Sequence, residues 1–364
     1  MRTIIRRRRH GGLRAVSMIA VAGLVLAACG GDDDETTTAA GEEAGDGSGA
    51  ETDGPSFDLS GETLRITASP PGSLTVGSRY VFDKLEEWGA EVDVIELTTT
   101  TGIQALIADQ SDAGTHGADE VVLGAAEGAE VVAIGAPVSR MDYVLIGSSD
   151  IESVEDLEGA SIAMSGPAGF DTLLTRMTMR NVGLDPESDA RFVQIGGSGE
   201  RAAALLTDNV QAATVFLEDW YEISQRTDDL RLVQYMAELV PDFPSDVYFG
   251  TSEFWAEHED LATAIACANL EANALFIQGK DTYIEFAAPL VPGATEEGIG
   301  NSYDAAMEID MWPQTPGEIL NVDGFAGLID AMVETGDISQ AVDAASLVDI
   351  SYLEAAAEMG CGQT

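Results

Sequence analysis

Short apolar runs and amphipathic stretches alternate along the chain from Leu64 onward. The runs predict strands, and the stretches, whose apolar residues recur every three or four positions, predict helices. The predicted strands are 64–68, 91–97, 131–134, 143–146, 161–164, 191–195 and 212–216, and the predicted helices are 74–88, 103–109, 118–126, 167–181 and 200–206. Strands separated by helices in this way are typical of parallel sheets with right-handed crossovers. We therefore predict an α/β fold.

Two helix starts carry local signals. Thr101 precedes the helix at 103–109 and is a typical N-cap residue. Pro167 suits the first position of the next long helix, and Asp171 would lie in its first turn, where negative charge is favourable. We expect that helix to begin near Pro167.

Four turns follow predicted strands, at 69–72, 98–102, 165–170 and 196–199. In α/β lobes small molecules bind outside the carboxyl ends of strands, where helix starts expose backbone N–H groups. The turn at 165–169 is the strongest candidate, because its small residues let a ligand approach the backbone. The predicted ligand-binding residues are Ser69, Thr100, His116, Arg140, Ser165, Gly166, Ala168, Gly169, Phe170, Ser198, Asp219 and Trp220.

The sequence leaves the chemistry of the ligand open. N–H groups at helix starts favour a carboxylate or sulfonate, with Arg140 as the cation most expected in a cleft. Phe170 and Trp220 could instead stack on an aromatic or pyrimidine-like ligand, and Asp219 or Asp119 could accept a hydrogen bond from its amine. For each of these residues the alternative is a structural role: a core aromatic, a solvated carboxylate or a salt bridge between lobes.

The N-terminus predicts export and a lipid anchor. Four arginines at 6–9 and Arg14 precede an apolar run of about 14 residues, which is shorter than the roughly 20 of a membrane-spanning helix. The run ends at Ala28, and Cys29 directly after it resembles the lipid-attachment cysteine of bacterial lipoproteins. The alternative is an ordinary signal peptide whose next residue happens to be a cysteine. We interpret 1–28 as a signal peptide, and 29–60, which is rich in acidic residues and glycine, as a disordered tether.

Charge and cysteine content restrict the partners. Six of the 17 basic residues lie before Cys29, which leaves 11 against 64 Asp and Glu. Such a chain does not favour nucleic acid or anionic lipid surfaces, because little neutralises phosphate. Beyond Cys29 only Cys267 and Cys361 remain, and in an exported protein two such cysteines are candidates for a disulfide. The alternative for Cys267 is a small buried side chain on a helix.

Catalytic motifs are missing from the sequence. Only His116 and His258 remain beyond the signal peptide, and neither a Gly-x-Ser-x-Gly nor a His-Glu-x-x-His motif occurs. Ser198 lies in a glycine-rich turn that lacks the third glycine of a dinucleotide loop. The acidic run at 32–35 lacks the spaced ligands of a calcium loop. We predict no enzyme, no cofactor and no metal site.

Four segments carry a family resemblance. The segment 153–163 resembles the start of the second lobe in extracytoplasmic solute-binding proteins of ABC transporters, and 251–261 resembles the segment in which their chain returns to the first lobe. The segments 104–113 and 203–213 are similar to a short sequence motif that occurs in each lobe of these proteins, although the usual glycine is replaced near Gln110. Within that superfamily the spacing is similar to the branch for nitrate, sulfonate, taurine and thiamine-precursor pyrimidines.

The resemblance implies a type II periplasmic-binding-protein fold: two lobes, each with a mainly parallel sheet, joined by two crossings. Lobe 1 would comprise 61–138 and 246–364, and lobe 2 would comprise 139–245. It implies a lipid-anchored, monomeric substrate-binding protein on the outer face of the cell membrane, which delivers a small-molecule solute to a permease and an ATPase. The alternatives are a solute-sensing receptor, a structural surface lipoprotein and an enzyme resembling pyrimidine-precursor synthases; this chain lacks the cysteine cluster of the last.

Overall fold

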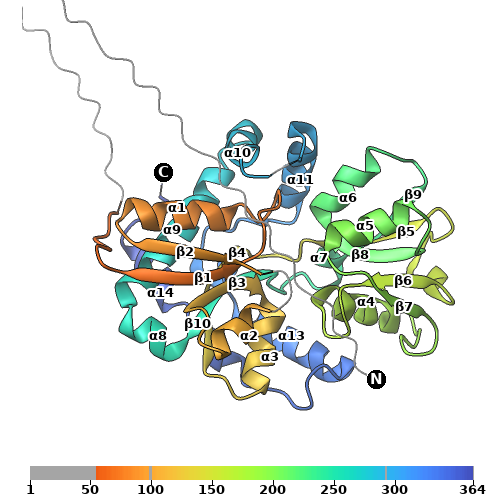
Figure 1. The fold of residues 1–364 in the computed structure, drawn as a ribbon, viewed down its shortest axis with the longest axis horizontal. Coiled ribbons are helices and arrows are strands. Elements are labelled where there is room, and N and C mark those ends of the chain that lie inside the picture. Colours follow the sequence, from red (N-terminus) through yellow and green to blue (C-terminus); the bar gives the residue numbers. More distant parts are fainter. Residues whose placement is uncertain (1–54, 98–100, 292, 364) are drawn as a thin grey trace, which may run out of the picture. The chain divides into compact units, whose positions relative to one another are not determined.

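The computed structural model describes residues 55–97, 101–291 and 293–363 (Figure 1). The predicted signal peptide, Cys29, most of the predicted tether and the candidate residue Thr100 lie outside these ranges. The described residues form two five-stranded sheets, each flanked by helices. We call the two parts lobe 1 and lobe 2.

The sheet of lobe 1 has the order β2-β1-β3-β10-β4. Its strands are β1 (Thr63–Ala68), β2 (Glu91–Glu96), β3 (Ala113–Gly117), β4 (Val131–Val138) and β10 (Asp246–Thr251). Helices α1 (Gly77–Glu87) and α14 (Ser351–Glu358) pack against α9 (Glu259–Phe276), which contacts β4. Helices α2 (Gly102–Ile107) and α3 (Ala118–Ala126) contact β3, and α8 (Ser252–Glu257) follows β10.

The sheet of lobe 2 has the order β7-β6-β8-β5-β9. Its strands are β5 (Tyr143–Ser148), β6 (Ser161–Met164), β7 (Arg191–Gln194), β8 (Ala212–Phe216) and β9 (Leu230–Tyr235). The 3₁₀ helix η1 (Val154–Leu157) precedes β6. The helices are α4 (Phe170–Asn181), α5 (Ser198–Leu206), α6 (Leu217–Ser224) and α7 (Met236–Leu239); α4, α5 and α6 all contact β8.

Both sheets are mixed. β1 pairs in parallel with β2 and β3, and β6 pairs in parallel with β7 and β8. β10 runs antiparallel to β3 and β4, whereas β5 runs antiparallel to β8 and β9. The antiparallel pairs involve β5 and β10, the first strand that the chain forms after each passage between lobes. The α/β class and the periplasmic-binding-protein fold are confirmed, with more antiparallel pairing than the sequence pattern predicts.

Two crossings join the lobes, at 139–142 and at 236–245. A hydrogen bond ties them together: Ser245 Oγ donates to Asp142 Oδ1 at 2.6 Å, and both side chains are buried. The backbone N–H of Ser245 also donates to the carbonyl oxygen of Val138 at 3.2 Å. The two passages therefore form one joint rather than two separate linkers.

Further helical segments follow α9 in the sequence. They are α10 (Lys280–Ala287), α11 (Glu296–Glu308), α12 (Pro316–Ile319), α13 (Val322–Thr335) and the 3₁₀ helix η2 (Ala344–Ser346). α11 packs on α6 of lobe 2, and α13 packs on α4 of lobe 2 and on α3 of lobe 1. Phe276, Tyr283 and Trp312 form the aromatic centre of a core cluster that also contains lobe 2 residues such as Val215.

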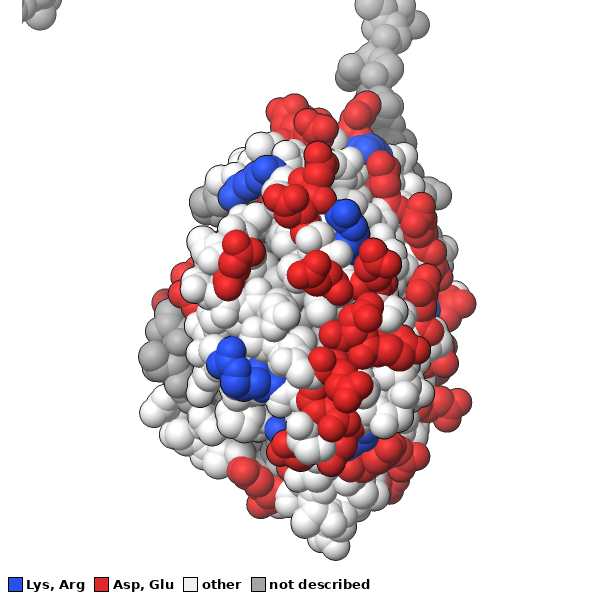
Figure 2. Space-filling model, turned by 90° about the vertical axis from the view of Figure 1, so that its right-hand side faces the viewer, with Lys and Arg blue, Asp and Glu red and all other residues white. Residues whose placement is uncertain are grey.

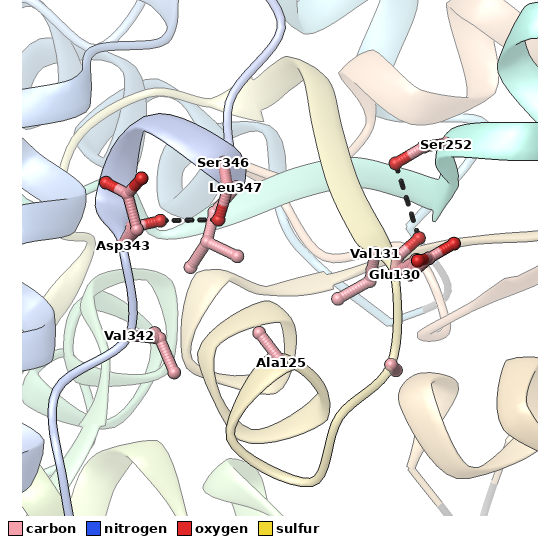
Figure 3. A pocket seen from close by; sticks show the side chains of 9 residues that line it. Ala125, Glu130, Val131, Ser252, Val342, Asp343, Ser346 and Leu347 are labelled. Carbon is pink, nitrogen blue, oxygen red and sulfur yellow. Dashed lines mark hydrogen bonds between the residues drawn. The ribbon is translucent and has the colours of Figure 1, made fainter.

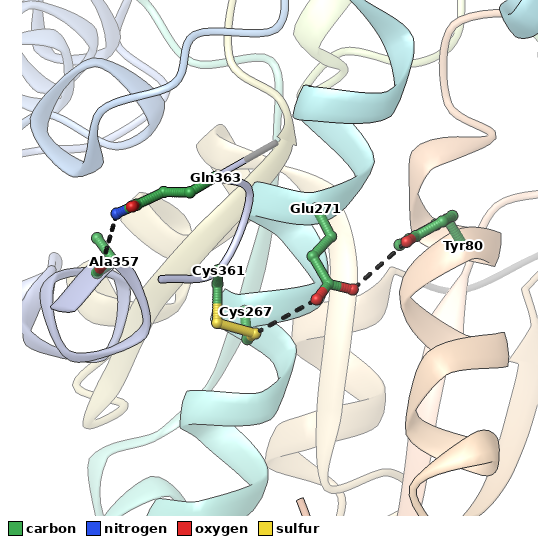
Figure 4. The surroundings of a disulfide bond; sticks show 6 residues. All are labelled: Tyr80, Cys267, Glu271, Ala357, Cys361 and Gln363. Carbon is green, nitrogen blue, oxygen red and sulfur yellow. Dashed lines mark hydrogen bonds between the residues drawn. A yellow bond between two sulfur atoms is a disulfide. The ribbon is translucent and has the colours of Figure 1, made fainter. Parts of the chain in front are cut away.

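A disulfide joins Cys267 of α9 to Cys361, close to the end of the described chain (Figure 4). Cys267 is fully buried and Cys361 nearly so. One turn further along α9, Glu271 accepts a hydrogen bond of 3.4 Å from Tyr80 Oη of α1. The bridge therefore ties the C-terminal segment to the central helix of lobe 1.

The helix starts are partly as the sequence predicts. The N-cap prediction for Thr101 is confirmed, because its Oγ1 accepts the N–H of Gln104 at 3.3 Å. The prediction that the long helix begins at Pro167 is wrong: α4 begins at Phe170. The reason is a tight turn at 166–169, in which the carbonyl oxygen of Gly166 accepts the N–H of Gly169 at 3.1 Å and Thr172 Oγ1 at 2.7 Å.

Acidic side chains cover much of the surface. On the face seen in Figure 2, Asp and Glu form extended patches with few Lys and Arg between them. Among the described residues, no helix has both the length and the apolar character needed to cross a membrane. Surface acidity alone therefore does not point to a ligand, and it carries an argument only where carboxylates are buried together.

Candidate functional site

A cavity of about 470 Å³ lies between the two lobes. Its lobe 1 wall comes from the loops after β1 and β3 and from the start of β10, and its lobe 2 wall comes from the loops after β6, β7 and β8. These are the positions where an α/β fold offers loops and helix starts to a ligand. The volume suits a small molecule.

All four turns singled out in the sequence contribute to this cavity. Of the predicted ligand-binding residues, Ser69, His116, Ser165, Ala168, Gly169, Phe170 and Ser198 line it. The turn at 98–102 contributes Thr101, while Thr100 is outside the described residues. The structure thus brings together side chains that lie up to 129 positions apart, from Ser69 to Ser198.

Four predicted residues do not line the cavity. Arg140 lies at the first crossing, but its Nη1 donates to the carbonyl oxygens of Ser139 and Glu318 at 3.0 and 2.8 Å. Gly166 supplies only its carbonyl oxygen to the tight turn before α4. Asp219 lines a neighbouring hollow of about 300 Å³, and Trp220 packs against a hydrophobic core cluster.

Three carboxyl groups form the lobe 1 wall. Asp119 is only 7% exposed, and burial, together with the nearby Glu120, raises its pKa well above the usual value. Burial also raises the pKa of Glu120 to about 7, although its carboxylate accepts the N–H of Ile103 at 2.8 Å. At the start of β10, burial and the negative charges of Asp142 and Asp119 raise the pKa of Asp246 to about 8. Among the described residues, no hydrogen-bond donor reaches the Asp246 carboxyl group.

Lobe 2 adds Glu218 and a buried ion pair. Arg201 is 3% exposed, and its Nε lies 3.5 Å from Asp171 Oδ2 and donates to the carbonyl oxygen of Thr214 at 3.0 Å. Its Nη1 donates to the carbonyl oxygen of Gly196. Asp171 also accepts the backbone N–H of Ser165 at 3.0 Å and the Ser165 hydroxyl. Both charges of this pair are therefore already satisfied within lobe 2.

Glu218 reaches across the cavity to lobe 1. Its Oε2 accepts the backbone N–H of Leu74 at 2.8 Å. A Cβ atom at Gly72 would lie 1.8 Å from Glu218 Oε1, so a side chain there would displace the Glu218 carboxylate from this position. Burial and the adjacent Asp219 raise the pKa of Glu218 to about 8. Glu218 thus contacts lobe 1 and faces the cavity.

His116 belongs to the inner wall and lies in β3. The side chain is 8% exposed, and its Nε2 has no hydrogen-bond partner among the described residues. Burial lowers the pKa of His116 to about 4, which keeps the imidazole neutral near pH 7. A neutral ring can donate one hydrogen bond and accept another.

Three aromatic rings complete the lining. The ring of Tyr143 lies 4.6 Å from that of Phe216 and 5.9 Å from that of Phe170, measured between centroids. All three residues line the cavity, from the starts of β5 and α4 and the end of β8. The site therefore combines an aromatic wall with carboxyl groups.

A second hollow, of about 550 Å³, lies within lobe 1 alone (Figure 3). It is formed by α3, the starts of β4 and α8, and the segment 342–347. Its polar groups bond to one another: Ser252 Oγ donates to the carbonyl oxygen of Glu130 at 3.4 Å, and Ser346 Oγ donates to that of Asp343 at 2.6 Å. Movement of the lobes cannot enclose it, so the inter-lobe cavity is the better candidate.

The comparisons with known proteins agree with this architecture. Residues 85–279 match the family described as NMT1/THI5 like, which is more than half of the chain. The chain belongs to the NMT1/THI5-like family. The family resemblance stated from the sequence is thereby confirmed. A search of curated proteins found no match.

Solved structures share the fold of this NMT1/THI5-like chain. The ligand-binding component of an ABC-type import system from Staphylococcus aureus matches with a TM-score of 0.66 and 11% identity over 81% of this chain and 99% of that one. The periplasmic aliphatic sulphonate-binding protein SsuA from Escherichia coli matches with a TM-score of 0.62 and 19% identity over 79% of this chain and 92% of that one. The desulfurization enzyme DSZB matches with a TM-score of 0.59 and 16% identity over 82% and 99%.

The fold thus accommodates binding proteins and an enzyme, so function has to be argued from the site. The cavity contains three serines that the sequence singled out, Ser69, Ser165 and Ser198. Ser165 donates to Asp171, and Ser198 Oγ accepts the N–H of Phe216 at 2.8 Å. Among the described residues, no serine hydroxyl is hydrogen-bonded to the imidazole of His116. A serine–histidine pair is therefore not assembled among the described residues of the cavity.

Sequence reasoning missed most of the charged groups. Glu120, Glu218, Asp246 and Arg201 were not singled out, and Asp119 was weighed as a solvated surface charge. Glu218 and Asp246 do have a positional signal, because Glu218 lies just after the end of β8 and Asp246 is the first residue of β10, and both line the cavity between the lobes. In a chain with 64 acidic residues that signal is weak.

Proposed function

We propose that this chain is the substrate-binding subunit of an ABC importer, held by a lipid on Cys29 at the outer face of the cell membrane. The observation that carries the proposal is the cavity between two lobes at the carboxyl ends of their strands. Membership of the NMT1/THI5-like family supports it, and so does similarity to the ligand-binding component of an ABC-type import system and to a periplasmic sulphonate-binding protein. Within the described part of the cavity no serine is hydrogen-bonded to His116, which supports binding over catalysis.

The proposed mechanism uses the joint between the lobes. A solute that contacts both walls favours the closed arrangement, because it gains contacts there that the open one does not offer. The hydrogen bond from Leu74 to Glu218 forms only when the two lobes are close together, so it helps to define that state. A permease would then recognise the closed protein. A solute-sensing receptor would use the same cavity, and a structural lipoprotein would not respond to solutes.

Thermal unfolding with a solute panel tests the binding role. The panel comprises amines, pyrimidines, sulfonates and carboxylates, with protein that has been unfolded and refolded to remove any retained ligand. At about 100 times its dissociation constant a ligand adds about 2.7 kcal/mol, a rise in Tm of several degrees. Ala168→Trp, which fills the cavity from its edge, should abolish the shift, whereas Ala355→Trp on the exposed face of α14 should preserve it. No shift with any class would favour the structural lipoprotein.

Metabolic labelling with a radioactive fatty acid tests the anchor. We expect the protein to carry label and to sediment with membranes, and Cys29→Ser to lose both properties, because attachment requires the cysteine thiol. Cys267→Ala provides the control, since Cys267 is buried in a disulfide and should not affect labelling. Equal labelling of Cys29→Ser and the unmodified sequence would contradict lipid attachment at this residue.

A further inference from the structure

We infer that the inter-lobe cavity binds a small organic cation that carries N–H groups, with its charged nitrogen against Asp246 and Asp119. The inference rests on the proposed function, and it names the class of solute. Three independent features support it: the charge balance of the lining, an unpartnered buried imidazole, and the aromatic wall.

The charge balance of the cavity opposes an anion. Carboxyl groups from both lobes line it, and Arg201 is the one guanidinium group among the described lining residues. That group is 3% exposed and is held by Asp171 and two carbonyl oxygens, so it has little left to offer a ligand. An anion would be expected at the start of α4. The Asp171 carboxylate already lies there and accepts the backbone N–H of Ser165. A sulfonate in this cavity would meet several carboxyl groups and no free cation.

Asp246 differs from Glu120 and Glu218 in that it accepts no hydrogen bond from the described residues. Glu120 and Glu218 each accept a backbone N–H at 2.8 Å, whereas Asp246 faces Asp142 and Asp119 without a donor among the described residues. Buried carboxylates without a counter-charge are costly, and a cation at this position would remove the cost. With a pKa of about 8 this carboxyl group is largely protonated near pH 7, and a positively charged ligand beside it would favour its ionised form.

His116 points to the same ligand independently of charge. Its Nε2 is buried and lacks a partner among the described residues, although buried polar atoms are normally hydrogen-bonded. The low pKa of His116 keeps the ring neutral, so the imidazole does not repel a cation and can accept one of its N–H groups. An N–H donor in the cavity satisfies the histidine and the carboxylates together.

The aromatic wall suits the body of such a molecule. Tyr143, Phe170 and Phe216 present a continuous aromatic surface in a cavity that also contains carboxylates. Aromatic faces attract organic cations and pack against flat or apolar groups. A metal ion fits less well, because no group of three or more metal-binding side chains occurs in the part of the chain that the structure describes.

Matched pairs of probes test the sign of the ligand charge. We would measure thermal shifts and calorimetric affinities with benzylammonium against benzenesulfonate and with butylammonium and putrescine against butanesulfonate. We expect the ammonium compounds to bind and the sulfonates to be silent. Asp246→Asn should weaken ammonium binding at least tenfold, because it removes a charged acceptor. In the same variant the ligand-free Tm near pH 7 should rise, since folding no longer has to bury a carboxyl group whose pKa burial raises to about 8.

Asp93→Asn is the control for net charge. Asp93 lies exposed on β2, outside the cavity, and its replacement removes the same formal charge. We expect affinity within about twofold of the unmodified protein.

Sulfonate binding with no ammonium binding would overturn the inference and leave the solute-binding role intact. If Asp246→Asn and Ala168→Trp both left ammonium binding unchanged, the inference would also be overturned. The cation would then bind elsewhere on the acidic surface. If none of these probes bound, the inference would be overturned. The proposed function fails only if no solute of the whole panel binds.

Discussion

Removal of the Cys267–Cys361 disulfide should lower the free energy of unfolding by about 4 kcal/mol. The bridge closes a loop of 94 residues, and constraining a loop of that length in the unfolded chain is worth about 4.7 kcal/mol in the chain-entropy account, slightly more than disulfides typically contribute. The folded structure needs little change, because α9 and α14 still pack on each other without the bridge. Urea unfolding of Cys267→Ala/Cys361→Ala against the unmodified protein measures the difference.

Reduction provides the control for this prediction. Dithiothreitol should destabilise the unmodified protein by nearly the same amount and should not affect the double variant. Solute binding should survive in both, because neither cysteine lines the inter-lobe cavity. A loss below about 1 kcal/mol would show that packing of the C-terminal segment, rather than the covalent link, holds it to lobe 1.

The loops that form the candidate site could be predicted from the sequence because local patterns show where they lie. Apolar runs, amphipathic stretches and glycine-rich turns show where strands end, and in α/β lobes those ends face the ligand. Seven predicted residues accordingly line one cavity, among them Ser69, Ser165 and Ser198. The family resemblance supplied the pairing of two lobes, which local patterns do not contain.

The charge of the site could not be predicted, because burial and partners are set by contacts between distant segments. Arg140 looked available for a ligand, yet Glu318, 178 positions away, accepts its hydrogen bond. Asp119 looked like one of many surface carboxylates, yet the packing of β3, α3 and β10 buries it. The antiparallel direction of β10 likewise follows from the return of the chain through the second crossing, which no local pattern encodes.

Arg201→Met should destabilise the protein by about 3 to 5 kcal/mol. Arg201 and Asp171 form a buried ion pair, and removal of one partner leaves an uncompensated charge in a site that water hardly reaches. The substitution also deprives the carbonyl oxygens of Thr214 and Gly196 of their donor. Arg226→Met is the control, because Arg226 is 64% exposed and its pair with Glu222, at 3.7 Å, should contribute less than about 1 kcal/mol.

A double-mutant cycle separates the charge from the packing. Asp171→Asn in the Arg201→Met background removes the uncompensated charge and should recover part of the loss, so the two changes should be clearly non-additive. Additive losses, or equal losses for Arg201→Met and Arg226→Met, would contradict a buried pair. The pair matters for the site because it connects the loops after β6 and β7, which form much of the lobe 2 wall. Its guanidinium therefore shapes the cavity and leaves the recognition of solute charge to the carboxyl groups around it.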